Sequence, residues 1–154
     1  MFMEREGMAF FLRLLMHAQR DKGRSRFGLS SHTFPIAGRP GTTAMFTAPG
    51  AFNGYARLMQ DSKTFKNEVC ARLFFMAHGP DPVVASKRVQ CPTLFLACEQ
   101  DNITAPNSYE PAAAALEDLA EVKTYPIGHF DIYEGVHFEN AVNEMIIFTK
   151  KHLS

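Results

Sequence analysis

Residues 91–98, CPTLFLAC, form a short, unbroken apolar run that is opened by a proline and closed by the polar EQDN. A run of this length without alternation is typical of a strand buried on both faces, as in a parallel sheet. A second strand is predicted in EVKTYPI, residues 121–127, and a helix entered through Asn107 or Ser108 lies between the two. A final helix over 137–152 completes a strand–helix–strand–helix unit with one right-handed parallel crossover. The predicted fold class is therefore α/β.

The region before this unit is predicted to be mainly helical. Helices are expected over residues 4–20, 50–60, 63–77 and 82–88. The basic, glycine- and serine-rich stretch 21–34 predicts a solvated loop. Three prolines and three glycines in the stretch 34–52 predict an irregular extended segment with tight turns.

Composition excludes several functional classes. A chain of 154 residues favours one domain, and a hydrophobic content of 46% predicts a substantial core. Lysine plus arginine equals aspartate plus glutamate at 16 each, which gives no electrostatic reason to expect nucleic acid or an anionic membrane as partner. Cys70, Cys91 and Cys98 form no CxxC pair, which favours a reducing compartment. No secretory leader or membrane-spanning run is recognised, so a soluble, cytoplasmic protein is expected.

Two polar residues follow the predicted strands and carry the chemistry. Asp101 comes after CPTLFLACEQ, and His129 comes after EVKTYPIG. Because the carboxyl ends of adjacent parallel strands meet at one edge of a sheet, Asp101 is expected to hydrogen-bond one ring nitrogen of His129. That bond would fix the histidine tautomer and stabilise the imidazolium when the other nitrogen takes a proton.

These residues carry a resemblance. CPTLFLACEQDNITAP, YPIGHFDIYEG and a terminal helix closing with FTKKHL resemble the C-terminal end of the α/β-hydrolase fold. With GRPGTTAMFTAPGAFNGYARL and FKNEVCARL upstream, the chain is similar to the branch of fungal polyketide transferases and peptidase S15-like hydrolases. The resemblance implies a helical cap-like region over 1–88 and the C-terminal part of the hydrolase core over 89–154. It also implies that Asp101 is the triad acid and His129 the general base.

The chain departs from the family at the nucleophile. The family carries its serine on a strand–GxSxG–helix elbow before the acid, and this sequence contains no GxSxG. The nearest sequences, GRSRF at 23–27 and GLSSH at 28–32, lack the closing glycine. The resemblance therefore implies an incomplete α/β-hydrolase fold that is inactive alone.

Other uses of the polar residues are weaker. Cys98 lies near Asp101, but a buried strand end without positive charge does not activate a thiol, so Cys98 is interpreted as structural. A metal site from Asp101, His129, Asp131 and His137 would have no recognised ligand spacing. No metal and no cofactor are expected.

Three hypotheses remain open. The chain could act as the C-terminal part of a serine hydrolase or acyl transferase, with a small apolar acyl or polyketide-like substrate, once an N-terminal half is supplied. It could instead be a non-catalytic remnant that binds an apolar ligand or a protein partner. In the third hypothesis it forms an oligomer that completes the sheet through an exposed edge.

Overall fold

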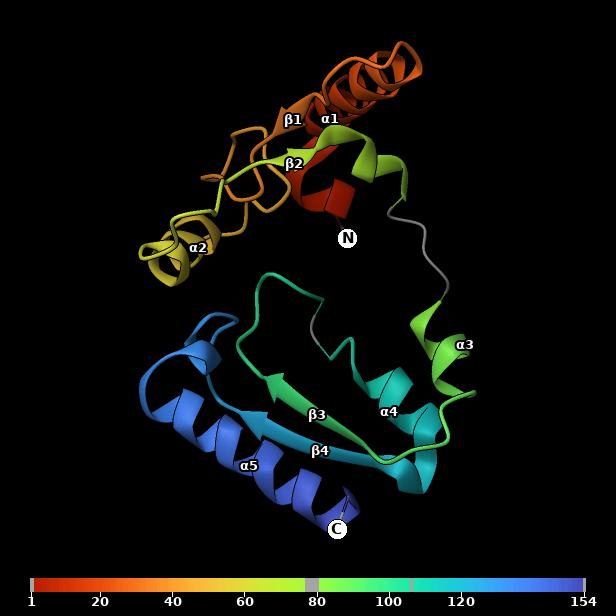
Figure 1. Ribbon diagram of the computed structural model, residues 1–154, viewed down its shortest axis with the longest axis vertical. Helices are drawn as coiled ribbons and strands as arrows, with labels where there is room; N and C mark the ends of the chain where they lie inside the picture. The colour runs from red at the N-terminus through yellow and green to blue at the C-terminus, as the bar shows by residue number, and fades with distance from the viewer. Residues whose placement is uncertain (1, 77–80, 106, 154) are drawn as a thin grey trace. The chain divides into compact units, whose positions relative to one another are not determined.

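The computed structural model describes residues 2–76, 81–105 and 107–153 and divides into two compact units, Met1–Gly79 and Pro80–Ser154 (Figure 1). The elements of the first unit are the helix α1 (Phe2–Arg26), the short strand β1 (Thr33–Phe34), the helix α2 (Ala51–Met59), the strand β2 (Val69–Cys70) and the 3₁₀ helix η1 (Ala71–Met76). The second unit contains α3 (Pro82–Ser86), β3 (Thr93–Cys98), α4 (Glu110–Leu116), η2 (Glu117–Leu119), β4 (Ala120–Tyr125), η3 (Asp131–Tyr133) and α5 (Gly135–Leu153).

The first helix is longer than predicted. It is interrupted at Gly7, where φ is 78°, and then continues to Arg26 through a stretch predicted to be loop. Residues 21–26 contain no proline, and the chain leaves the helix only near Gly28, whose φ of 65° is a left-handed conformation that suits a helix end. The Arg24 guanidinium also donates to the Ser30 carbonyl at 2.7 Å, which secures this turn.

The helix predicted over 63–77, whose last residue lies outside the described residues, is wrong over residues 63–70, whereas Ala71–Met76 forms the 3₁₀ helix η1. Val69–Cys70 instead pairs antiparallel with Thr33–Phe34. The Asn67 side chain holds the backbone of Ala37, accepting from its N–H at 2.9 Å and donating to its carbonyl at 2.8 Å. These long-range contacts override the helical spacing of the apolar residues. The extended stretch 34–52 and the helix predicted over 50–60 are confirmed.

The core of the first unit combines apolar packing with a buried carboxylate. Phe10 and Leu14 of α1 pack with Phe34 and Ala71. Asp21 is fully buried, and its carboxylate accepts from the backbone N–H of His32 at 2.7 Å and of Arg72 at 3.0 Å. The Arg72 guanidinium lies 2.9 Å from the same carboxylate. Asp21 therefore ties α1 to the two segments that carry β1 and η1.

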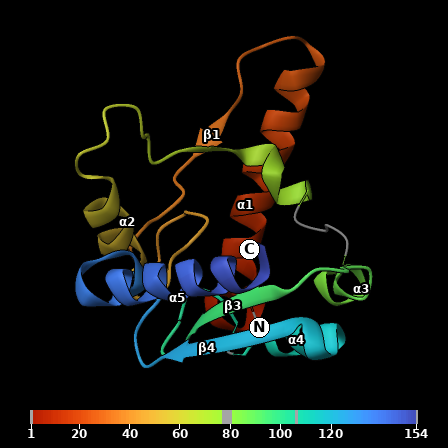
Figure 2. The same ribbon diagram turned by 60° about the horizontal axis from the view of Figure 1, so that its bottom comes forward.

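The second unit is built on one pair of parallel strands. The register places Thr93 opposite Ala120 and Cys98 opposite Tyr125. Figures 1 and 2 show α4 and α5 on opposite sides of this pair. The predicted strand–helix–strand–helix order and the parallel pairing are confirmed, as is the short helix predicted over 82–88.

The expectation that the first of these strands is buried on both faces is only partly met. In β3 only Ala97 is buried, whereas Leu94, Phe95 and Leu96 are half-buried. Among the described residues, β3 has β4 as its sole partner strand, so one long edge of β3 lacks a partner strand there. No helix in the described part of the chain is both long and apolar enough to cross a membrane.

Candidate active site

The parallel strands bring the two predicted site residues to the same edge of the sheet. The hydrogen-bond ladder continues past the strand ends, because Glu99 donates its N–H to the Tyr125 carbonyl at 2.8 Å and Gln100 to the Ile127 carbonyl at 3.0 Å. Asp101 follows Gln100, and His129 lies two residues after Ile127. The loop that carries Asp101 and the loop that carries His129 are thus held side by side by backbone bonds.

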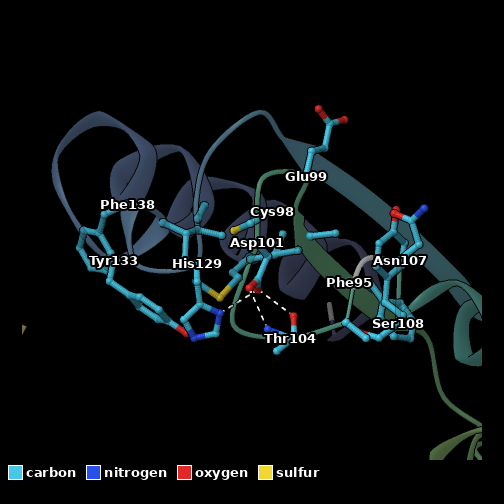
Figure 3. A pocket seen from close by; sticks show the side chains of 17 residues that line it. Phe95, Cys98, Glu99, Asp101, Thr104, Asn107, Ser108, His129, Tyr133 and Phe138 are labelled. Atoms are coloured by element: carbon cyan, nitrogen blue, oxygen red, sulfur yellow. Dashed lines mark hydrogen bonds and ion pairs between the residues drawn. The ribbon is translucent and has the colours of Figure 1, made fainter. Parts of the chain in front are cut away.

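Asp101 and His129 form a direct hydrogen bond. His129 Nδ1 lies 2.7 Å from Asp101 Oδ2, and the two side chains are 26% and 15% exposed (Figure 3). This bond is confirmed as predicted from the strand order. Among the described residues no hydrogen bond to His129 Nε2 is found, so that nitrogen is available to exchange a proton with a further group.

The Asp101 carboxylate accepts four hydrogen bonds. Oδ1 accepts from the backbone N–H of Ile103 at 2.8 Å and of Thr104 at 3.0 Å. Oδ2 accepts from the Thr104 hydroxyl at 2.8 Å as well as from His129. Partial burial alone would raise the pKa of Asp101, but the hydrogen bonds from His129, Thr104 and Ile103 outweigh it and lower this pKa. Asp101 is therefore a fixed anion beside the imidazole.

The turn that carries His129 is itself held by a second aspartate. Asp131 Oδ2 accepts from the Gly128 backbone N–H at 2.9 Å, and the Asp131 N–H donates to the Gly128 carbonyl at 3.2 Å. A Cβ at Gly128 would lie only 3.1 Å from Asp131 Oδ2, so the close approach favours glycine. Sequence reasoning considered Asp131 only as a metal ligand and passed over Thr104. An aspartate three residues after a glycine is the available signal for Asp131.

An open cavity of about 440 Å³ adjoins the pair. Asp101 and His129 lie in its lining (Figure 3). Most of the remaining wall is apolar or aromatic and comes from β3, the segment before α4, η3 and α5: Phe95, Leu96, Ala97, Tyr109, Ile132, Tyr133, Phe138, Ala141 and Met145. His129 thus borders a space suited to apolar groups.

The residues considered as substitute nucleophiles have other surroundings. Burial, followed by the charges of Asp101 and Asp131, raises the pKa of the Cys98 thiol, which disfavours the reactive thiolate. Ser30 accepts a hydrogen bond from the Arg24 guanidinium at 2.8 Å, and Ser31 accepts one from the Arg72 guanidinium at 2.6 Å. These serines are engaged in structural contacts of the first unit.

A metal centre is not assembled in the described part of the chain. No group of three or more histidine, cysteine, aspartate or glutamate side chains lies close enough there to hold an ion. The site consists of the hydrogen-bonded pair Asp101 and His129 and an adjoining, mainly apolar cavity.

Comparisons with known proteins place this geometry in context. No family model matches the sequence. The quorum-quenching protein AidA of Acinetobacter baumannii is 35% identical over 140 residues, which cover 91% of this chain and 46% of AidA. Two Escherichia coli proteins, each described as an uncharacterized 31.7 kDa protein of the traX-finO intergenic region, are 33% identical over 76 residues, covering 47% of this chain and 26% of theirs.

Among solved structures, the complex of DcsB with its substrate analogue superposes with a TM-score of 0.66 at 17% identity. The superposition covers 92% of this chain and 50% of DcsB. The chain thus spans about half the length of AidA and of DcsB. At a coarse level the two similarities support a hydrolase-like fold with mixed helices and strands, and they give no support to the narrower resemblance to fungal polyketide transferases.

Proposed function

We propose that Asp101 and His129 are the acid and the general base of a serine-hydrolase or acyl-transfer site in an incomplete α/β-hydrolase fold. The observation that carries the proposal is the 2.7 Å bond between His129 Nδ1 and an Asp101 carboxylate that is held by three further hydrogen bonds. Such an anchored pair orients the imidazole and leaves Nε2 free to act on a hydroxyl. That hydroxyl is carried by a segment that this sequence does not contain.

The reaction would run through an acyl intermediate. His129 Nε2 takes the proton of the hydroxyl as its oxygen attacks an ester carbonyl carbon, and Asp101 stabilises the resulting imidazolium. His129 then returns the proton to the departing alkoxide as the bond between the carbonyl carbon and the alkoxide oxygen breaks. In the second half, water gives hydrolysis and an acceptor alcohol gives acyl transfer, with His129 again taking and returning one proton.

The substrate class is a small apolar acyl compound. The cavity beside His129 is lined mainly by apolar and aromatic side chains, which suits an acyl chain. AidA is named a quorum-quenching protein, and that name suggests small signalling compounds as the first substrates to test. Polyketide-like acyl esters are the second choice.

A chimera tests this proposal. The 140-residue matched region of AidA is replaced by the corresponding region of this chain, and hydrolysis of p-nitrophenyl esters of increasing acyl length is measured. His129→Ala should lower kcat/KM by about 10³-fold or more, and Asp101→Asn by about 10³–10⁴-fold. His152→Ala is the matched control, because His152 lies on α5 and bonds Glu121 instead of Asp101.

The alternative, a non-catalytic protein that binds an apolar ligand or a partner, makes the opposite prediction. Binding by such a protein would be indifferent to both substitutions. An active chimera that keeps full activity with His129→Ala would refute the acid–base role.

A further inference from the structure

The helix α1 carries apolar side chains on two faces. One face packs into the core of the first unit through Phe10, Leu14 and Ala18. A second set recurs about once per helical turn and is exposed to solvent: Met8, Leu12 and Met16. This second set therefore forms an apolar stripe along the solvent side of the helix.

The turn after α1 extends this stripe. Phe27 comes 11 residues after Met16, which is about three helical turns, and its side chain is 81% exposed. Leu29 is exposed as well. The N–H groups of Phe27 and Leu29 both donate to the Arg24 carbonyl at 3.1 Å, so a hydrogen-bonded turn presents these two apolar side chains. Figures 1 and 2 show this turn at the opposite end of the first unit from α2.

Positive charge is concentrated on the same segment. Residues 8–29 contain one acid, Asp21, and five cations: Arg13, Arg20, Lys22, Arg24 and Arg26. The segment therefore has a net charge of +4 (5 − 1), whereas the other 11 cations and 15 acids of the chain give −4. Asp21 is fully buried and paired with Arg72, so the charges that the segment presents to solvent are positive. The balanced total of the whole chain conceals this local excess.

The cations lie on both flanks of the apolar stripe. A rotation of about 100° per residue places Arg20 and Arg24 on one flank of the stripe, and Lys22 and Arg26 on the other. Arginine and lysine side chains can lay their apolar stems along an apolar surface while their charged ends stay in a polar layer. We call the exposed side of residues 8–29 the α1 outer face.

We propose that the α1 outer face docks on the surface of an anionic phospholipid membrane. The apolar stripe and Phe27 enter the layer between the headgroups and the acyl chains, and the flanking cations contact lipid phosphates and carboxylates. An exposed apolar stripe bordered by arginine and lysine is typical of helices that lie in the plane of a membrane surface. A cluster of four or more cations beside such a stripe favours anionic lipids. The inference goes beyond the proposed function and does not depend on it.

Other occupants fit only one part of this surface. A nucleic acid would pair with the cations but would leave Met8, Leu12 and Met16 in water. A further segment of an AidA-like protein would cover the apolar stripe, but it would have to supply acids for the cations on both flanks. A membrane surface offers acyl chains and negative charges side by side.

A single tryptophan tests the inference, because the chain contains none. Phe27→Trp places it at the exposed end of the α1 outer face, and its emission is measured with vesicles of phosphatidylcholine, either alone or with about 30% phosphatidylserine. The emission should move to shorter wavelength with the anionic vesicles only. The lipid concentration at half-saturation should rise at least about tenfold between about 0.1 and 0.5 M NaCl.

A second reporter shows whether the contact is made by the α1 outer face. Ile147→Trp is the matched variant, because Ile147 is exposed on α5. Its emission should not move with either kind of vesicle. No shift for Phe27→Trp, or the same shift for Ile147→Trp, would overturn the inference.

Charge substitutions in the Phe27→Trp protein test the flanking cations. Arg20→Gln combined with Arg26→Gln should lower the affinity for anionic vesicles by about tenfold or more. Lys63→Gln combined with Lys87→Gln removes the same charge outside the α1 outer face and should change the affinity by less than about twofold. Equal effects of the two pairs would show that only the net charge matters, and would overturn the inference.

The rival occupants predict other results. Met16→Gln should weaken vesicle binding by at least about threefold, because the stripe loses apolar contact with the bilayer. Unchanged binding by Met16→Gln, or an equal emission shift with a DNA duplex, would indicate a site for polyanions and overturn the membrane contact. In the AidA chimera, a Phe27→Trp emission already at short wavelength without vesicles would show that the rest of the protein covers this face. That result would also overturn the inference.

Discussion

Replacing Asp21 with asparagine should destabilise the first unit more than any other single-atom change to a polar side chain. The Asp21 side chain is fully buried, and three donors converge on it, from the His32 backbone, the Arg72 backbone and the Arg72 guanidinium. Asparagine keeps the shape but turns one oxygen into an NH₂ group. That group would face donors and leave at least one of them unpaired.

The expected magnitude follows from the burial and charge of this site. Each hydrogen bond to a charged group contributes about 1.5–3 kcal/mol, but the three bonds share one carboxylate and do not add. Breaking a buried ion pair from one side costs about 3–5 kcal/mol. We therefore expect Asp21→Asn to lower the free energy of unfolding of the first unit by about 3–5 kcal/mol. Net stabilities are only about 5–15 kcal/mol, so the effect should be easy to measure.

Urea titration followed by amide hydrogen exchange and mass spectrometry would resolve the two units. Peptides from α1 and β1 should lose protection at lower urea in Asp21→Asn, whereas peptides from β3 and β4 should not change. Glu68→Gln is the control, because that carboxylate is 44% exposed, accepts one bond from Thr33 and should cost under about 1 kcal/mol. A loss under about 1 kcal/mol for Asp21→Asn would refute the reasoning.

The Asp21 carboxylate should also contribute to the unfolding of the first unit at low pH. Burial alone would raise the pKa of Asp21. The backbone hydrogen bonds from Arg72 and His32, together with the charge and side-chain hydrogen bond of Arg72, outweigh burial and lower this pKa. A carboxyl whose pKa is lower in the folded state stabilises the fold above its unfolded value of about 3.9, and that contribution is lost as the pH falls toward the folded value. Asp21→Asn should lack this component of the acid transition.

Three further outcomes are expected. Tyr125→Phe should leave the free energy of unfolding in urea unchanged or raise it by about 1 kcal/mol. The reason is that the Tyr125 hydroxyl is buried without a hydrogen-bond partner among the described residues. A loss above about 1 kcal/mol would contradict this. Thr104→Val should raise the pKa of Asp101 in a carboxyl ¹³C NMR titration, because the Thr104 hydroxyl is one of the contacts that lower it, and Thr104→Ser should not. Burial, followed by the charge of Arg20, lowers the pKa of His32, so the unfolded state binds a proton more readily than the folded state. The free energy of unfolding of the first unit should therefore fall as the pH drops below about 6.5. A free energy of unfolding that stays constant from pH 7 to 5 would refute this.

The site was accessible to sequence reasoning because its geometry follows from strand order. An apolar run before Asp101 and a second strand before His129 predict parallel pairing. The backbone hydrogen bonds that continue through Glu99 hold both side chains at the same edge of the sheet. The supporting groups were missed for a physical reason. Thr104 and Asp131 act through local backbone turns, and the apolar pattern along the chain carries no information about such turns.

The first unit was less predictable because its structure depends on long-range polar contacts. The apolar spacing over 63–77 fits a helix, but pairing with Thr33–Phe34 and the Asn67 side chain impose a strand there. The extension of α1 to Arg26 has a similar cause. Its last turns include Asp21, and the partners of this residue lie 11 and 51 positions away in the sequence.

The hydrogen bonds that shape the Asp101–His129 pair lie in one continuous stretch, from β3 to the turn closed by Asp131. The backbone ladder, the Thr104 bonds and the Gly128 turn need nothing from the first unit. Such a stretch fixes the orientation of the His129 imidazole through contacts that all lie between β3 and Asp131. Under the proposed function, a split reporter could use this stretch to supply the histidine and a second segment to supply the serine. Its colour would appear only when the two halves meet.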